Sequence, residues 1–149
     1  MIEEILDKDM MIFDLKSNDK LSVLKELIKP LAAKDAIDDE DKFLDVVLKR
    51  EEEYSTGIGM GVAIPHGKSS LVKKASLVFG KSKEGIDYNS MDGKPAHLFF
   101  LIAAPENSDN IHLKILAKLS RSLMHEEVRE ELNKAETYED VVNAFKKYE

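Results

Sequence analysis

The chain has 149 residues, of which 43% are hydrophobic and 34% are charged, and its formal net charge is −7. These values predict one domain over residues 1–149 with a sizeable core, and the negative charge argues against a nucleic-acid-binding surface. The absence of cysteine excludes disulfides, a cysteine nucleophile and thiolate metal sites, and no segment reaches the roughly 20 apolar residues of a membrane span.

The first third of the chain predicts a short strand and two helices. Residues 10–15 are strand-like. Residues 17–34 carry apolar residues at helical spacing, with Ser17 or Asn18 as the cap and Pro30 expected to kink or shorten the helix. Residues 38–54 predict a second helix with an acidic first turn. One face of that helix carries Phe43, Val46, Val47, Arg50 and Tyr54, so Arg50 is expected to point inward.

The rest of the chain alternates strands and helices. Residues 61–65, 75–82 and 97–105 are strand-like, and the last is almost continuously apolar, as in a central strand. Residues 83–96 are rich in turn signals. Helices are expected over residues 108–124, 125–135 and 137–149, the last with Thr137 as N-cap and Asp140 at the capping-box position. This interleaving predicts a layered α/β domain.

The segment "GIGMGVAIPHGKSS", residues 57–70, is the most unusual stretch, and three familiar site types do not fit it. A phosphate-binding loop ending in Gly67-Lys68-Ser69 would need glycine where Val62 stands. The four histidines form no zinc motif, and a His66–His112 pair would still lack a nearby carboxylate. No G-x-S-x-G motif marks a serine nucleophile. The sequence therefore predicts no metal and no cofactor.

His66 itself remains as a candidate nucleophile, because a neutral imidazole can form covalent intermediates. Pro65 and Gly67 flank it, and the glycines before it could let backbone N–H groups approach a phosphoryl group. His112 lies on the apolar face of its helix, and with Arg50 it could complete an anion site. The alternatives stay open: a glycine-rich turn with a surface histidine, a core histidine at His112, and an arginine extended toward solvent.

Two further stretches make the chain resemble a known family. "STGIGMGVAIPHGK", followed by "GIDYNSMDGKPAHLFFLIAAPENSDNIHLKILAKLS", is similar to the fructose/mannitol-type enzyme IIA of the bacterial phosphoenolpyruvate-dependent sugar phosphotransferase system. The resemblance covers essentially the whole chain. It implies a three-layer α/β/α fold, with a mixed sheet of about five strands and helices on both faces. It also implies a cytoplasmic protein without direct membrane insertion.

The resemblance further implies a function and the residues that perform it. The chain would be a phosphotransferase with a phosphohistidine intermediate, accepting the phosphoryl group at Nε2 of His66 while His112 and Arg50 flank it. The implied donor is the small histidine-containing phosphocarrier protein, and the implied acceptor is a cysteine of enzyme IIB, which serves the membrane permease enzyme IIC. Of the apolar residues in the glycine stretch, Met60 is the candidate to line the docking surface, since flexible methionine suits two different partners.

Two functions remain open on the sequence. The chain could be a carrier for coupled sugar uptake and phosphorylation, of the fructose type, or a nitrogen-type regulatory enzyme IIA that acts by phosphorylation-dependent protein binding. Both would keep His66, so the motif does not separate them. The sugar or polyol, the oligomeric state, and whether IIB and IIC are separate chains are not readable from the sequence.

Overall fold

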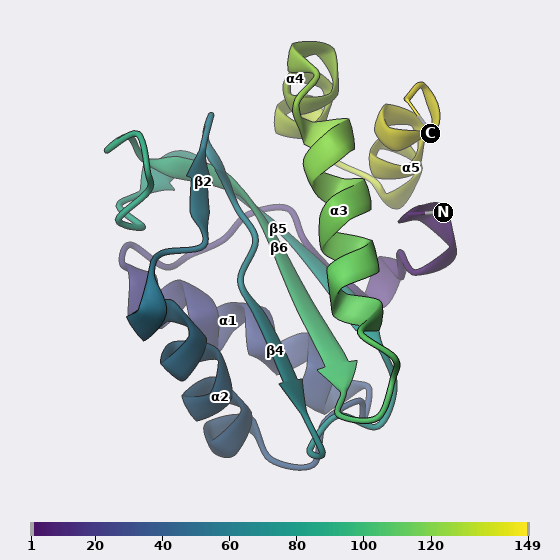
Figure 1. Ribbon diagram of the computed structural model, residues 1–149. Helices are drawn as coiled ribbons and strands as arrows, with labels where there is room; N and C mark the ends of the chain where they lie inside the picture. The colour runs from purple at the N-terminus through teal and green to yellow at the C-terminus, as the bar shows by residue number, and fades with distance from the viewer. Residues whose placement is uncertain (1, 149) are drawn as a thin grey trace.

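A computed structural model describes residues 2–148 and has a mixed β-sheet between two layers of helices (Figure 1). The strands are β1 (Met11–Ile12), β2 (Gly57–Gly59), β3 (Val62–Ala63), β4 (His66–Ser69), β5 (Ser76–Ile86) and β6 (Ala96–Pro105). The α-helices are α1 (Lys20–Ala33), α2 (Glu40–Glu53), α3 (Ile111–Leu123), α4 (Glu126–Lys134) and α5 (Tyr138–Lys146). Two 3-10 turns, η1 (Ile2–Glu4) and η2 (Lys8–Met10), precede β1. The layered α/β domain predicted from the sequence, and the α/β/α fold that the resemblance implies, are confirmed, with six strands among the described residues in place of about five.

The two long strands form the centre of the sheet. Its order is β1-β5-β6-β3-β2, and β4 also pairs with β6. β5 and β6 are antiparallel, whereas β1 runs parallel to β5, and β3 and β4 run parallel to β6. β3 and β4 follow each other along the same side of β6, with Val62 opposite Leu98 and His66 opposite Ile102. The apolar stretch at 97–105 is therefore the central strand that its composition predicts.

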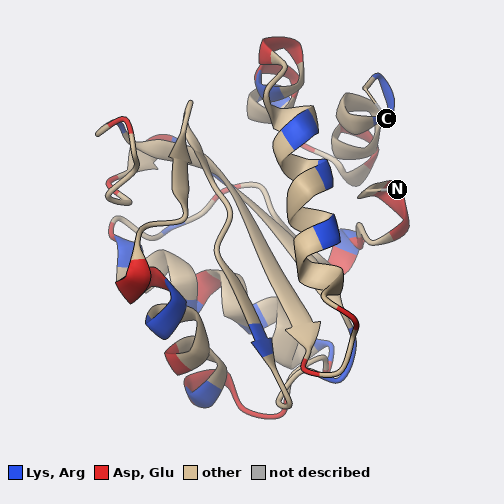
Figure 2. Ribbon diagram, viewed as in Figure 1, with Lys and Arg blue, Asp and Glu red and all other residues tan. Residues whose placement is uncertain are grey.

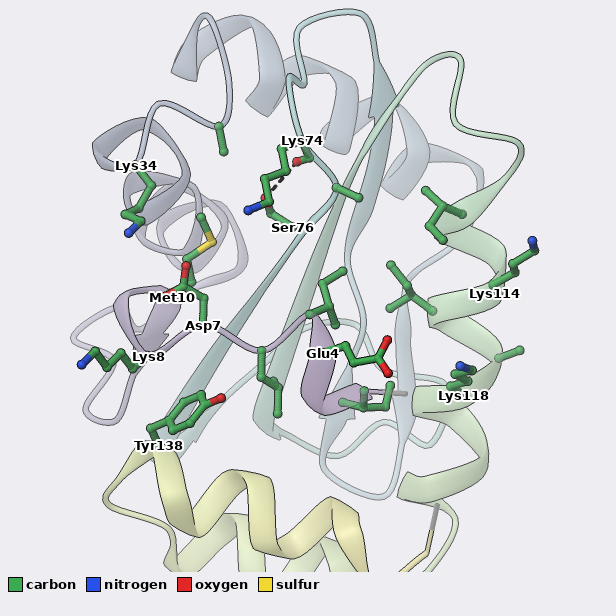
Figure 3. Close-up of a pocket in the computed structure, with 18 of the residues that line it drawn as sticks. Glu4, Asp7, Lys8, Met10, Lys34, Lys74, Ser76, Lys114, Lys118 and Tyr138 are labelled. Carbon is green, nitrogen blue, oxygen red and sulfur yellow. Dashed lines mark hydrogen bonds between the residues drawn. The ribbon is translucent and has the colours of Figure 1, made fainter.

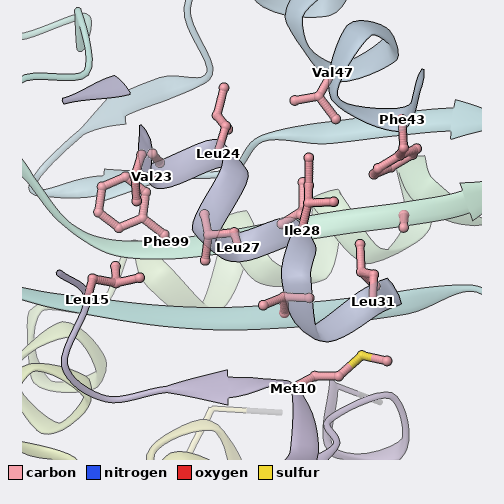
Figure 4. Packing of buried hydrophobic residues seen from close by; sticks show 14 of the residues in the cluster. Met10, Leu15, Val23, Leu24, Leu27, Ile28, Leu31, Phe43, Val47 and Phe99 are labelled. Carbon is pink, nitrogen blue, oxygen red and sulfur yellow. The ribbon is translucent and has the colours of Figure 1, made fainter. Parts of the chain in front are cut away.

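The sheet separates two hydrophobic cores. In β6, Phe99, Leu101 and Ala103 face one core, and Leu98, Phe100 and Ile102 face the other, as the two-residue period of a strand requires. The first core packs under α1 and α2, where Leu24, Leu27, Ile28 and Leu31 of α1 lie against the sheet (Figure 4). The second core is covered by α3, α4, α5 and η1. Within residues 2–148, no helix combines the length and apolar character needed to cross a membrane.

The helix ends agree only in part with the sequence expectations. The capping box at the start of α5 is present, since Thr137 Oγ1 accepts from the Asp140 N–H and Asp140 accepts in return. The N-cap predicted for α1 is wrong, because Asp19, and not Ser17 or Asn18, accepts the hydrogen bond from the Ser22 N–H at 2.8 Å. Pro30 does not end α1, which runs on to Ala33. Its missing N–H removes one backbone hydrogen bond, while buried Leu31 keeps the following turn on the core.

The strand boundaries needed larger corrections. β5 continues to Ile86, so strand residues replace the first part of the expected turn region at 83–96. β2 and β4 were not expected at all. His66 is the first residue of β4, and its side chain is half-buried, not an exposed group on a flexible loop.

Candidate active site

The site lies at β4, where the two helical layers meet the same edge of the sheet (Figure 1). Among the described strands, β4 pairs only with β6. Alternation along β4 directs His66 and Lys68 to one face and Gly67 to the other. A Cβ on Gly67 would lie 3.1 Å from two ring carbons of Phe43 and 3.2 Å from Cγ1 of Val46. Glycine at this position therefore lets α2 pack directly against the strand that carries His66.

The ring of His66 is fixed by a backbone hydrogen bond. Its Nδ1 lies 3.0 Å from the carbonyl oxygen of Ile64. Because a carbonyl oxygen only accepts, Nδ1 must carry the proton, and the lone pair of the neutral ring is then on Nε2. Burial lowers the pKa of His66, and the positive charge of Arg50 also lowers it. The hydrogen bond to Ile64 acts in the opposite direction and raises this pKa. The site thus favours a neutral imidazole with a nucleophilic Nε2.

His112 comes to this site from the opposite helical layer. It lies in the first turn of α3, and its ring centroid is 6.3 Å from that of His66, with an angle of 31° between the rings. Its buried Nδ1 makes no hydrogen bond with any described residue. Partial burial lowers the pKa of His112, and the nearby His66 and Lys68 lower it further. The structure therefore brings the two histidines together, as the sequence suggested they could be.

Lys68 adds a cation to this site that was not among the residues predicted from the sequence. Its Nζ donates to Oδ1 of Asn110, the residue that precedes α3, at 3.2 Å. The signal was present in the sequence, because Lys68 follows His66 by two residues and must share its face once the segment is a strand. Lys68 and the positive end of the α3 dipole both favour an anion beside His112.

Arg50 approaches from the last turn of α2 and is half-buried. Its Nη1 donates to the Tyr54 carbonyl oxygen at 2.9 Å, and its Cζ lies 4.2 Å from the centroid of the Tyr54 ring. The prediction that one face of α2 points into the core is confirmed for Phe43 and Val47, which are fully buried. It is wrong for Tyr54, which lies beyond the helix end and is 64% exposed. The charge of Arg50 adds to the lowering of the His66 pKa, and the guanidinium is held at the C-terminal end of α2 by its contacts with Tyr54.

The glycines before His66 serve a hairpin, which corrects their expected role as a phosphate cradle. Gly59 and Gly61 have φ values of +94° and +76° on either side of Met60, whose φ is 58°. Only the left-handed region closes this turn between β2 and β3, and glycine enters it without strain. The β6 partner of Val62, Leu98, lies four residues before the β6 partner of His66, Ile102, which is about 13 Å along the strand. The hairpin tip therefore lies against Asp92 and His97, not against His66.

A separate cavity of about 990 Å³ opens between the N-terminal turns and α3 (Figure 3). Its lining includes apolar residues of η1 and α3 with a rim of lysines, but none of Arg50, His66 and His112. The basic residues of α3 form a row along one side of that helix (Figure 2). The ammonium groups of Lys8 and Lys114 point outward from opposite rims, and Lys34 pairs with Asp9 at 2.9 Å. This cavity is therefore separate from the pair of histidines at β4.

The residues gathered at β4 suit transfer of an anionic group to a ring nitrogen. They include one imidazole whose pKa is lowered by burial, the cations Arg50 and Lys68, and a second histidine. Within residues 2–148, no group of three or more histidine, aspartate and glutamate side chains is arranged to hold a metal ion. Arg50, Lys68 and the N-terminal end of α3 are positively charged groups of this chain that can balance charge on a transferring group.

Comparisons with known proteins agree on one family. Residues 4–148 match the family described as "Phosphoenolpyruvate-dependent sugar phosphotransferase system, EIIA 2". The chain is 39% identical over 148 residues to the fructose-specific EIIABC component of Bacillus subtilis, covering 99% of this chain and 23% of that protein's length. It is 50% identical over 105 residues to the fructose-specific EIIA component of Haloferax volcanii, covering 70% of this chain and 68% of the relative.

Solved structures show the same fold. Nitrogen regulatory protein IIA-Ntr from Neisseria meningitidis superposes with a TM-score of 0.89 at 31% identity, covering 97% of this chain and 98% of that one. Enzyme IIA for mannitol from Escherichia coli, solved in complex with phosphorylated enzyme IIB for mannitol, gives a TM-score of 0.81 at 23% identity. That match covers 95% of this chain and 97% of the other. The relatives thus include both sugar-transport and nitrogen-regulatory proteins.

Proposed function

This chain belongs to the EIIA 2 family of the phosphoenolpyruvate-dependent sugar phosphotransferase system, and on that premise we propose that it carries a phosphoryl group on Nε2 of His66. The observation that carries the proposal is the hydrogen bond between His66 Nδ1 and the Ile64 carbonyl oxygen, 3.0 Å long. It leaves Nε2 as the free lone pair of a ring that burial keeps neutral.

The proposed transfer is a displacement at phosphorus. The Nε2 lone pair of His66 attacks the phosphorus atom of a phosphohistidine on the donor protein, a small histidine-containing phosphocarrier. The new P–N bond forms as the bond between phosphorus and the donor's imidazole breaks. The Nδ1 proton of His66 stays on its ring, so the ring becomes a phosphoimidazolium and remains a good leaving group. The group then passes to a cysteine thiolate of enzyme IIB, which must come from another domain or chain because this sequence has no cysteine.

The flanking cations act on the three non-bridging oxygens of the phosphoryl group. Arg50 offers a planar fork of donors beyond the one bonded to Tyr54, and Lys68 adds a point charge near His112. The unpartnered Nδ1 of His112 or its other ring nitrogen supplies a further hydrogen-bonding group. Phosphoryl transfer asks for such positioning and charge stabilisation more than for covalent chemistry by the protein.

We infer a transport role of the fructose type, because two relatives at 39% and 50% identity are fructose-specific components. A nitrogen-type regulatory role is the second candidate, supported by the 0.89 TM-score at 31% identity to IIA-Ntr. Transfer assays from the phosphorylated chain to purified IIB domains separate the two roles. Rapid transfer to a fructose-type IIB, with sugar phosphate formed when its IIC is present, supports transport. No transfer to any IIB supports regulation.

The assignment of the acceptor is tested by phosphorylation of His66→Ala. With phosphoenolpyruvate, enzyme I and the phosphocarrier protein, the unsubstituted chain should take up one equivalent of phosphoryl group in an acid-labile, alkali-stable form. His66→Ala should take up none. His125→Ala is the matched control, because His125 stacks on Tyr148 at 4.1 Å, away from β4, and its loss should leave labelling intact. Full labelling of His66→Ala would refute the assignment.

A further inference from the structure

A buried polar cluster lies directly behind the last turn of α2. The side chain of Glu51 is only 4% exposed, and Tyr88 and Thr56 are almost fully buried. The Oε1 atom of Glu51 pairs with Lys20 Nζ at 2.9 Å and accepts from the Thr56 N–H at 3.1 Å. Its Oε2 atom accepts from the hydroxyls of Thr56 and Tyr88. Four donors on one buried carboxylate hold α2, the segment before β2, and the loop after β5 in one arrangement.

Stability alone is a weak reason to bury this charge. Removing a carboxylate from water is costly, and apolar residues of similar volume often stabilise a core as well as a buried ion pair does. The first core already consists of buried hydrophobic residues from both helices and the sheet. A fixed buried carboxylate is better explained by something whose position it determines.

The cluster is connected to His66 by an unbroken series of hydrogen bonds. Thr56 donates its N–H and hydroxyl to Glu51, and the Thr56 carbonyl oxygen accepts from the Ile64 N–H at 3.0 Å. The Ile64 carbonyl oxygen in turn lies 3.0 Å from Nδ1 of His66. Each link is a backbone or buried group, so the position of the Ile64 carbonyl follows that of Thr56, and Thr56 is held by Glu51.

We propose that Glu51 is a positioning residue for His66, acting through Thr56 and Ile64 to hold the imidazole in its Nδ1–H form with Nε2 free. The inference rests on the proposed role of His66 as acceptor. No proton moves along the series. When the P–N bond forms at Nε2, the ring becomes cationic, and its retained Nδ1–H donates more strongly to a carbonyl oxygen already in place. The negative charge of Glu51 also favours the cationic ring, because it acts to raise the pKa of His66.

Two measurements on Glu51→Gln test the inference. Nitrogen-15 NMR of the unphosphorylated chain at neutral pH reports which ring nitrogen of His66 carries the proton. It should give Nδ1–H for the wild type and a mixture of both forms for the variant. Phosphoryl uptake from the phosphocarrier should be about tenfold slower, equivalent to about 1.4 kcal/mol in the barrier. A folded Glu51→Gln with the wild-type proton position and rate would overturn the inference.

A matched control separates positioning from loss of stability. Lys81 is another buried charge, 3% exposed, whose Nζ bonds the Ala135 carbonyl oxygen on the far side of the sheet from α2. Lys81→Met should lower the melting temperature yet leave the His66 proton position and the rate unchanged. Equal effects of both variants on the proton position and the rate would overturn the inference.

The Thr56 variants decide the matter if Glu51→Gln does not fold. Thr56→Val removes the hydroxyl bond at similar volume and should slow uptake, whereas Thr56→Ser keeps the hydroxyl and should restore it. Equal rates for the two would overturn the inference. Labelling of His66→Ala would count against the acceptor assignment alone. The proton position of His66 is measured without phosphoryl transfer, so it tests the positioning role separately.

Discussion

Gly67→Ala is expected to destabilise the protein and to slow phosphoryl transfer, although it adds only one methyl group. The added Cβ would lie 3.1 Å from Cε1 and Cζ of Phe43 and 3.2 Å from Cγ1 of Val46, closer than ordinary van der Waals contact. Phe43 is fully buried and belongs to the first core, so it cannot swing into solvent. The simplest relief is a shift of α2 away from β4.

The size of the effect follows from two opposing terms. Overpacking a close-packed site costs about 1–3 kcal/mol. The backbone of Gly67 is not in the left-handed region, so alanine also restricts the unfolded chain and returns about 0.4–1 kcal/mol. The net loss in the free energy of unfolding should be about 1–2 kcal/mol, or about 3–6 °C in melting temperature at roughly 3 °C per kcal/mol. Because α2 carries Arg50 and β4 carries His66, the shift should also slow transfer.

Urea unfolding of a double-mutant cycle with Phe43→Leu measures the contact itself. Phe43→Leu alone leaves a small cavity and costs stability, but in the double variant the freed space accepts the methyl group that Gly67→Ala adds. The double loss should be smaller than the sum of the single losses by at least about 0.5 kcal/mol. Gly93→Ala is the control, since its Cβ meets nothing within 4 Å and its φ is +72°, so it should lose stability without slower transfer. A Gly67→Ala protein as stable as the wild type, with additive losses in the cycle, would refute the packing argument.

Three further predictions concern the site directly. Arg50→Lys keeps the positive charge but loses the planar fork of donors, and His112→Gln keeps a hydrogen-bonding group that cannot ionise. Both variants should therefore transfer the phosphoryl group more slowly at an unchanged melting temperature. Unfolding of both variants, or wild-type transfer rates in both, would contradict these roles. Met60 is 48% exposed in a turn, and aspartate tolerates the left-handed backbone at this position. Met60→Asp should therefore weaken phosphoryl transfer both from the donor protein and to the acceptor protein. Met124→Asp is the control, because Met124 is 71% exposed at the end of α3, and it should leave both transfers unchanged. Because burial lowers the pKa of His66, the unfolded state binds more protons than the folded state below about pH 6.5. The free energy of unfolding should therefore fall as the pH drops toward 5. Urea unfolding at several pH values should show a weaker pH dependence for His66→Gln.

Local patterns in the sequence predicted most of the helices and the central strand. The capping box of α5 uses residues three apart, so its hydrogen bonds depend on nothing beyond that turn. β6 is apolar along both faces because both cores lie against it, and that composition alone indicates a buried central strand. The motif around His66 was also sufficient to suggest the family, since the Pro-His-Gly arrangement and the later Ile-His-Leu are short, contiguous signals.

The tertiary structure decided what those local signals became. β4 is a strand because β6 offers it a partner, and a four-residue segment with a glycine has little strand preference of its own. That pairing set the face on which Lys68 joins His66, and it placed Gly67 where α2 packs against the strand. Glu51 is one acid among several at the end of a helix in the sequence, yet two of its four donors, Lys20 and Tyr88, come from segments far from it in the chain. Hydrogen bonds of that kind depend on how distant segments pack, so no local pattern in a single sequence could have revealed them.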